Sequence, residues 1–163
     1  MSLLDLLAGL AAAGVRFIVV GGVAAAVHGS RRVTDDLDLL FDTAPDNLDR
    51  LSDLLAGWRA CPRGIEPGLS FIMDAQTLRG TEVLTLATDR GLLDLMAFVK
   101  GVGTYAKALA ATVVVELATG PVRVLSLPQL IAAKRAAARP RDREHLIELE
   151  ALRELQPPGA RER

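Results

Sequence analysis

The chain has 163 residues and a mass of 17.3 kDa, which is enough for one domain with a substantial buried core and short for two. Half of the residues are hydrophobic, 24% are charged, and the formal net charge is −1. This composition is that of a globular protein with no overall attraction to nucleic acid or to an anionic membrane. The single cysteine, Cys61, excludes an internal disulfide and a multi-cysteine zinc site.

The mean hydropathy of +0.29 raises the question of a membrane segment. The uncharged stretch over 17–30 is too short for a spanning helix, which needs about 20 residues, and Gly21-Gly22 interrupts its middle. The N-terminus carries Asp5 in place of the basic segment of a secretory signal. We therefore expect a cytoplasmic protein with no membrane partner.

The first half of the chain alternates helical and strand patterns. Leucines at helical spacing follow Ser2 and stop at Gly14, and an apolar, β-branched run then predicts a buried strand. Pro45 suits the first turn of a later helix. The predicted elements are a helix from 3 to Gly14, a strand over 15–20, a short helix over 23–28, a strand over 37–41, and a helix over 45–58.

The second half begins with a loop over 61–68, which contains two prolines and two glycines. The predicted elements that follow are strands over 69–73, 83–87 and 92–98, a short helix over 104–110, a hairpin of 113–117 with 122–125, and helices over 129–138 and 143–155. We find no repeat and no linker. The sequence therefore predicts one α/β domain over 1–156 and a disordered tail over 157–163.

A candidate anion site lies where the first strand meets Gly21-Gly22 and a helix begins. Backbone N–H groups at such a turn point outwards, and glycine lets a phosphate approach the backbone closely. A tight structural turn gives the same pattern, so the glycine pair alone is a weak signal.

Two carboxylates, Asp36 and Asp38, follow at a spacing of two residues on the predicted strand over 37–41. Residues i and i+2 of a strand project to the same face, so these side chains converge while Leu37 and Leu39 face the core. Converging carboxylates repel each other unless a cation compensates them. Mg²⁺ is the cation that this hard oxygen pair suits.

A third acid, Asp94, lies inside an otherwise apolar strand, where an unpaired charge is costly. Either a structural hydrogen bond or a metal ion would satisfy it. Two carboxylates on one strand and a third on its neighbour can hold two metal ions, which is the arrangement of phosphoryl and nucleotidyl transfer. From the residues alone, the sequence predicts metal-assisted phosphate chemistry.

The segment over 21–39 reads G-G-x-A-x-x-x-H-G-x-x-R-x-T-x-D-h-D-h, where h is apolar. It resembles the opening motif of the polymerase-β-like nucleotidyltransferase superfamily, and within it the minimal bacterial branch that includes the AbiEii-type toxins. Lys134 and the run over 139–143 are similar to that branch's late helical segment. Two departures are Gly22, where much of the superfamily has serine, and His145, where a second acid is expected.

The resemblance implies a mixed β-sheet with helices packed on one side, a nucleoside triphosphate at the glycine turn, and two Mg²⁺ ions. Asp36 and Asp38 would bind both ions, and Asp94 would bind the catalytic one and help to deprotonate the acceptor hydroxyl. The nucleotide would be bound by residues of the opening motif and the late helix, which are Gly21, Gly22, Arg32, Thr34 and Lys134.

The resemblance implies an acceptor hydroxyl on RNA or protein and the role of a toxin paired with an antitoxin from a neighbouring gene. A basic cluster over 134–143 could meet an RNA backbone, although charged residues there also suit a solvated helix. The alternatives are a non-catalytic, antitoxin-like binding module and a small-molecule transferase of the aminoglycoside-modifying type. All three carboxylates are present, which favours an enzyme.

Overall fold

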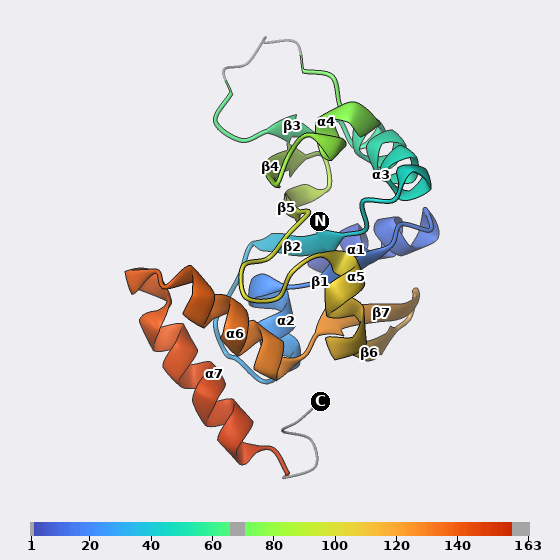
Figure 1. Ribbon diagram of the computed structural model, residues 1–163. Coiled ribbons are helices and arrows are strands. Elements are labelled where there is room, and N and C mark those ends of the chain that lie inside the picture. The colour runs from blue at the N-terminus through green and yellow to red at the C-terminus, as the bar shows by residue number, and fades with distance from the viewer. Residues whose placement is uncertain (1, 66–70, 158–163) are drawn as a thin grey trace.

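The computed structural model describes residues 2–65 and 71–157. These residues form a seven-stranded mixed sheet in the order β3-β4-β5-β2-β1-β7-β6 (Figure 1). The strands are β1 (Phe17–Val19), β2 (Asp36–Phe41), β3 (Cys61–Pro62), β4 (Val83–Thr88), β5 (Gly91–Met96), β6 (Thr112–Leu117) and β7 (Gly120–Leu125). The helices are α1 (Leu3–Ala12), α2 (Gly21–Val27), α3 (Pro45–Gly57), α4 (Ala75–Arg79), α5 (Tyr105–Ala108), α6 (Leu127–Ala137) and α7 (Arg143–Leu155), with short 3₁₀ turns η1 (Leu109–Ala111) and η2 (Pro140–Asp142).

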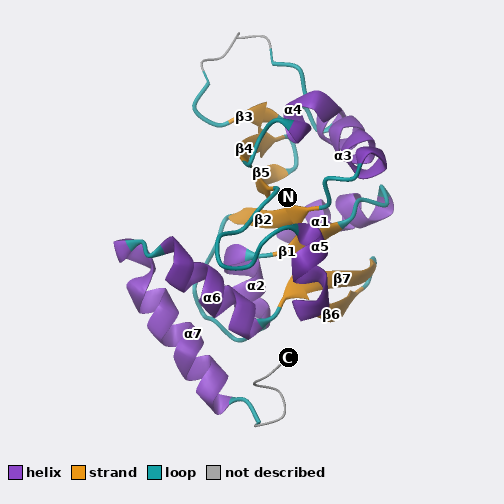
Figure 2. Cartoon of the chain, viewed as in Figure 1, coloured by secondary structure: helices purple, strands orange, loops and turns teal. Residues whose placement is uncertain are grey.

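The centre of the sheet combines parallel and antiparallel pairing. Strand β2 pairs antiparallel with β1 and parallel with β5, and β1 pairs parallel with β7. Figure 2 shows α6 and α7 side by side, away from α1 and α3. The predicted mixed α/β architecture is confirmed.

The two faces of β2 differ in burial. Leu37 and Leu39 are fully buried, whereas Asp36 and Asp38, which alternate with them, are half-buried. The leucines belong to one hydrophobic cluster with the leucines of α1 and α3. Alternation along the strand thus buries one face in the core and leaves the acidic face beside solvent.

Both core helices begin where the sequence supplies a start signal. The Ser2 side chain accepts the backbone N–H of Asp5, and the Asp5 carboxylate accepts the backbone N–H of Ser2, which forms a capping box at α1. Helix α3 begins with Pro45 at its first turn. The predicted helices and the 120–121 hairpin are confirmed with small shifts of their ends.

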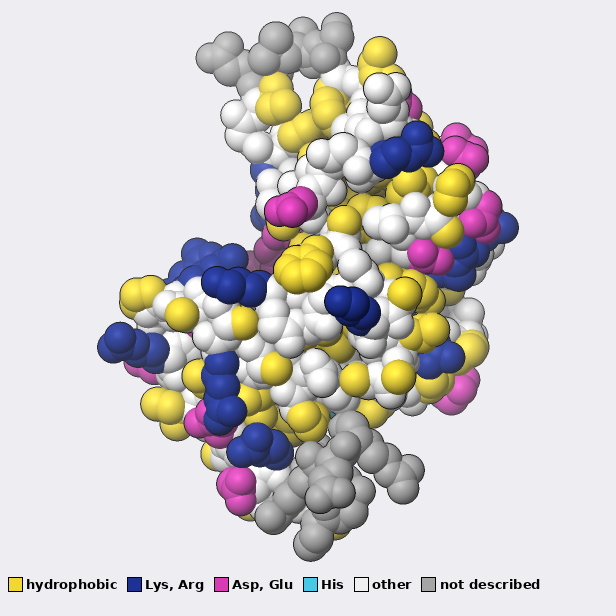
Figure 3. Space-filling view, viewed as in Figure 1, with side chains coloured by type: hydrophobic (Ala, Val, Ile, Leu, Met, Phe, Trp, Pro, Cys, Tyr) yellow, Lys and Arg dark blue, Asp and Glu magenta, His cyan; other side chains and the backbone are white. Residues whose placement is uncertain are grey.

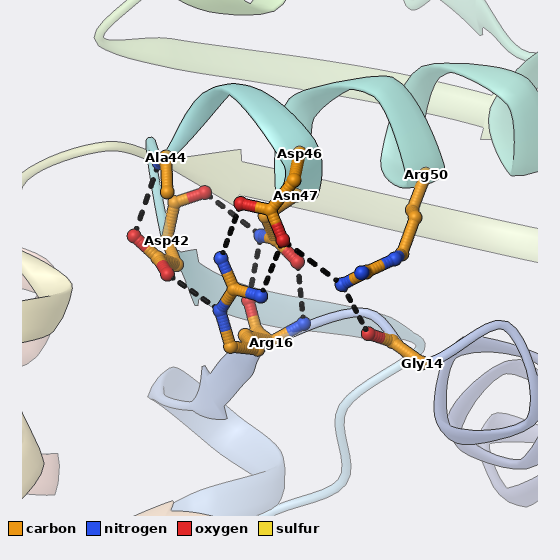
Figure 4. Close-up of polar contacts among 7 residues, drawn as sticks. All are labelled: Gly14, Arg16, Asp42, Ala44, Asp46, Asn47 and Arg50. Atoms are coloured by element: carbon orange, nitrogen blue, oxygen red, sulfur yellow. Dashed lines mark hydrogen bonds and ion pairs between the residues drawn. The ribbon is translucent and has the colours of Figure 1, made fainter.

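A buried amide fixes the start of α3 against the ends of β1 and β2 (Figure 4). The Asn47 side chain is fully buried; its Oδ1 accepts the backbone N–H of Arg16 at 2.7 Å, and its Nδ2 donates to the carbonyls of Arg16 at 3.0 Å and Asp42 at 2.8 Å. The Arg16 guanidinium bridges the carboxylates of Asp42 and Asp46 at 2.7 and 2.8 Å. This network holds the start of β1 and the end of β2 against the first turn of α3.

Three expectations need correction. The strand predicted over 69–73 is wrong where the structure describes it, because residues 71–73 form no strand and α4 follows, capped by Asp74. Residues 69 and 70 of that predicted strand lie outside the described residues, and so do residues 158–163 of the predicted tail. The loop predicted over 61–68 begins with the short strand β3, which pairs with the free edge of β4. The glycines after β1 are the first turn of α2 and not a break before it.

None of the helices formed by the described residues is both long enough and apolar enough to span a bilayer.

Replacing Asn47 with leucine is expected to lower the free energy of unfolding by about 2–3 kcal/mol, because three backbone groups lose a buried side-chain partner. Asp53→Ala on the exposed side of the same helix serves as the control and should change stability by less than about 0.5 kcal/mol. Urea unfolding measures both. Equal midpoints for the two variants would show that the amide does not anchor α3.

Candidate active site

The three predicted carboxylates lie on one face of the sheet. Asp38 of β2 stands directly opposite Asp94 of β5 in the parallel ladder, and Asp36 lies two residues earlier on the same face as Asp38. The convergence predicted from the sequence is therefore present. It brings three negative charges onto two adjacent strands.

A basic residue that sequence reasoning missed, Arg63, compensates part of this charge. Its guanidinium forms an ion pair and hydrogen bond with Asp94, and its second nitrogen lies 3.7 Å from Asp36 Oδ2. Arg63 follows β3 directly, and its backbone N–H donates to the carbonyl of Thr85 on β4 at 2.9 Å. No local pattern points to this residue, because its position depends on the pairing of β3 with β4.

The carboxylates differ in their electrostatic setting. Burial raises the pKa of Asp38 to about 6, the Asp36 charge adds to the rise, and the backbone N–H of Gly22 opposes it. Burial also raises the pKa of Asp94, and the charge of Arg63 works against that rise. Asp38 is thus the carboxylate whose ionisation the fold disfavours most clearly. A bound cation would stabilise its charged form.

The glycine turn is packed against the carboxylate face. Gly21 has a φ of +61°, and a Cβ there would collide with the Asp38 side chain. A Cβ on Gly22 would lie 2.7 Å from Cβ and Oγ1 of Thr34. The Gly22 N–H points at Asp38 Oδ2 at 3.4 Å, so the expectation that the turn's N–H groups face outwards is wrong for Gly22. The departure from serine at Gly22 has a structural reason, because Thr34 fills the space.

Thr34 also orients the first carboxylate. Its hydroxyl donates to Asp36 Oδ1 at 2.9 Å. The hydroxyl therefore links the glycine turn to the start of β2.

A cleft of about 810 Å³ opens beside these residues. Figure 3 shows a hollow with Lys and Arg side chains gathered on one rim. The lining includes most of the residues that sequence analysis singled out, which are Gly21, Gly22, Arg32, Thr34, Asp38 and Lys134. Asp36 and Asp94 are not part of the lining; both are joined to Arg63.

The far wall of the cleft comes from α6 and α7. Lys134 Nζ donates to Asp142 Oδ1 at 2.9 Å, and Arg32 contacts Glu144 at 3.3 Å and Glu148 at 3.5 Å. Both predicted cationic residues are therefore present at the cleft, each already paired with an acid. The late helical segment thus faces the opening motif across the cleft.

Each of the two histidines has a hydrogen-bond partner within the fold. His28 Nε2 donates to the carbonyl of Leu125 at 2.8 Å, so this nitrogen makes a hydrogen bond between α2 and the end of β7. His145 is buried with its Nε2 3.4 Å from Ser30 Oγ, and burial lowers its pKa. Where a second acid was expected, His145 is thus a largely neutral, packed side chain.

The donor chemistry of the site fits a divalent cation, because carboxylate oxygens converge around Asp38, whose charge burial disfavours. As the side chains stand, no three Asp, Glu, His or Cys residues within 2–65 and 71–157 are grouped closely enough to hold a metal ion. In this arrangement Arg63 contacts one oxygen of Asp36 and one oxygen of Asp94.

Comparison with solved structures identifies the architecture. An antibiotic-resistance factor, ANT(2'')-Ia, superposes with a TM-score of 0.56 at 17% identity over 96% of this chain and 83% of its own. A nucleotidyltransferase from Thermotoga maritima matches with a TM-score of 0.55 at 16% identity over 93% of this chain and 96% of its own. The chain has the nucleotidyltransferase fold.

An antigenic nucleotidyltransferase-like protein from Paracoccidioides brasiliensis shares the nucleotidyltransferase fold, with a TM-score of 0.52 at 18% identity over 96% of this chain and 76% of its own. No protein-family model matches the chain, and no curated protein matches it by sequence. The likeness is therefore one of fold, and the chemistry rests on the residues of the site.

In the absence of metal, Asp38→Asn is expected to be more stable than the wild type at pH 7. Because the folded pKa of Asp38 is raised from 3.8 to about 6, the wild type loses stability as pH rises between these values. The variant should gain about 1–2 kcal/mol at pH 7, and the difference should shrink towards pH 4. Chemical unfolding with a chelator present measures this, and equal stability at pH 7 would contradict the stated burial of charge.

Gly22→Ala is expected to lower stability by about 1–3 kcal/mol, because the new methyl group overlaps Thr34. In a Thr34→Gly background the same change should cost much less, and a double-mutant cycle isolates this coupling. Gly57→Ala, where nothing lies within 4 Å of the added Cβ, is the matched control. Additive effects at Gly22 and Thr34 would rule out the packing explanation.

Proposed function

We propose that the protein is a metal-dependent nucleotidyltransferase that moves a nucleotide from a nucleoside triphosphate to a hydroxyl of RNA or protein. One observation carries the proposal: Asp38 and Asp94 stand opposite each other on parallel strands, with Asp36 on the same face and the glycine turn packed beside them. The fold shared with nucleotidyltransferases supports this chemistry.

Asp36 and Asp38 would hold two Mg²⁺ ions, and Asp94 would hold the one beside the acceptor. When bound, these ions neutralise the triphosphate and lower the pKa of the attacking hydroxyl. Asp94 then assists removal of the hydroxyl proton. The acceptor oxygen forms a bond to the α-phosphorus as the bond to the pyrophosphate oxygen breaks, and pyrophosphate leaves.

The rest of the cleft would position the nucleotide. Gly21 and Gly22 have no side chain to block a phosphate, and Arg32 and Lys134 lie in the lining with their positive charges. The Glu and Asp partners of these two basic residues hold them in place before the nucleotide arrives. The contribution of the protein is mainly positioning and charge neutralisation.

The charges around the cleft bear on the acceptor. Lys100 and Arg139 line it together with Arg32 and Lys134. Within the described residues, Arg139, Arg141 and Arg143 have no carboxylate within ion-pair distance. Asp38, Glu82 and Asp142 line the cleft as well, but Arg139 lines it without such a carboxylate partner and favours an acceptor with phosphate groups over a polycation. This supports RNA as the acceptor more than an aminoglycoside.

The resemblance of the opening motif to the AbiEii-type branch supports a toxin role, with an antitoxin as the partner protein. The likeness to the resistance factor ANT(2'')-Ia favours the second candidate, a small-molecule transferase. Incubation of the protein with each labelled nucleotide, Mg²⁺, total RNA, total protein and aminoglycosides distinguishes these acceptors by which one becomes labelled.

Asp94→Asn is expected to leave nucleotide affinity within a few-fold and to lower transfer by at least ~10²-fold, the lower end of a general acid–base contribution. The variant keeps the size and an oxygen ligand but loses the charge. Asp53→Asn, on the exposed side of α3, should transfer at the wild-type rate. A folded Asp94→Asn protein that labels its acceptor normally would overturn the proposed mechanism.

A further inference from the structure

Arg63 occupies a distinctive place on the carboxylate face. Its guanidinium joins Asp94, the acid assigned to the acceptor side, to Asp36, the first acid of β2. The backbone N–H of Arg63 donates a hydrogen bond to the carbonyl of Thr85. Thr85 in turn stands opposite Asp94 in the β4–β5 ladder. The sheet therefore fixes the base of this side chain beside Asp94.

The tip of the side chain, in contrast, can move without opening the core. The side chain of Arg63 is 31% exposed and that of Asp36 is 34% exposed. An arginine with a fixed backbone and a solvent-facing head can exchange its partners by side-chain rotation alone. The pair with Asp36 is long and partly exposed, and such a pair is weak, so another cation can replace it. The pair with Asp94, whose side chain is 18% exposed, is the more buried of the two.

We propose that Arg63 is a positioning residue that serves as the counter-cation of the metal-free site and is displaced when a divalent cation binds; this inference rests on the proposed function. The guanidinium contacts one oxygen of Asp36 and one of Asp94, and a divalent cation bound at the same carboxylates would repel its positive charge. Without either cation, three carboxylates on two adjacent strands would repel each other. The exchange keeps the site compensated in both states and sets the affinity for the metal.

Binding of Mn²⁺ alone tests the proposal. Electron paramagnetic resonance of the free ion measures this binding. Arg63→Ala removes the competitor and should bind Mn²⁺ at least about fivefold more tightly than the wild type. Arg63→Lys keeps a positive charge and should stay near the wild-type affinity. Arg59→Ala, which breaks an exposed pair with Asp89 away from the site, is the matched control and should not change the affinity.

Melting temperature gives a second readout. Without metal, Arg63→Ala should melt below the wild type, and saturating Mg²⁺ should remove most of that difference. A merely structural ion pair would give the same loss with and without Mg²⁺. If Arg63→Ala does not fold, Arg63→Gln, which lacks the charge but keeps hydrogen-bond donors, takes its place in both measurements.

The outcomes separate this inference from the proposed function. Unchanged or weaker Mn²⁺ binding by Arg63→Ala, alongside metal-dependent transfer by the wild type, overturns the inference and leaves the function standing. Absence of Mn²⁺ binding and of metal-dependent transfer in every variant overturns both. Tighter binding together with Mg²⁺-reversible destabilisation supports the exchange.

Discussion

Repulsion between like charges is the constraint around which this protein is arranged. The parallel register of β2 and β5 places Asp38 opposite Asp94 and brings Asp36 to the same face. Such a cluster is unfavourable for folding unless a cation compensates it. The guanidinium of Arg63 meets this cluster, and burial together with the charge of Asp36 raises the pKa of Asp38.

The opposite face of the same strands supplies the stability that the acidic face reduces. Leu37 and Leu39 are fully buried in the cluster that includes leucines of α1 and α3. At the end of β2, the amide of Asn47 ties α3 to the sheet with three hydrogen bonds. Because strand residues alternate between faces, the chain carries charge on one face and leucine for stability on the other within the same six residues.

Prediction from sequence succeeded where one local rule decided the outcome. The i and i+2 spacing was enough to place Asp36 and Asp38 on one face, and Pro45 marked the start of α3. It failed over 71–73, where apolar residues suggested a strand but no neighbouring strand accepts them. Strand formation needs a partner edge, and the edge of β4 is taken by β3.

The sequence by itself determined the acid pair, the glycine turn and the order of most helices and strands, because each depends on residues close together in the chain. Only the tertiary structure decided that Thr34 fills the space beside Gly22 and that Arg63 lies against Asp94. These contacts join segments that no periodicity connects. They exist because the β2–β5 and β3–β4 pairings fix which side chains share a face, and that register is a property of the whole sheet.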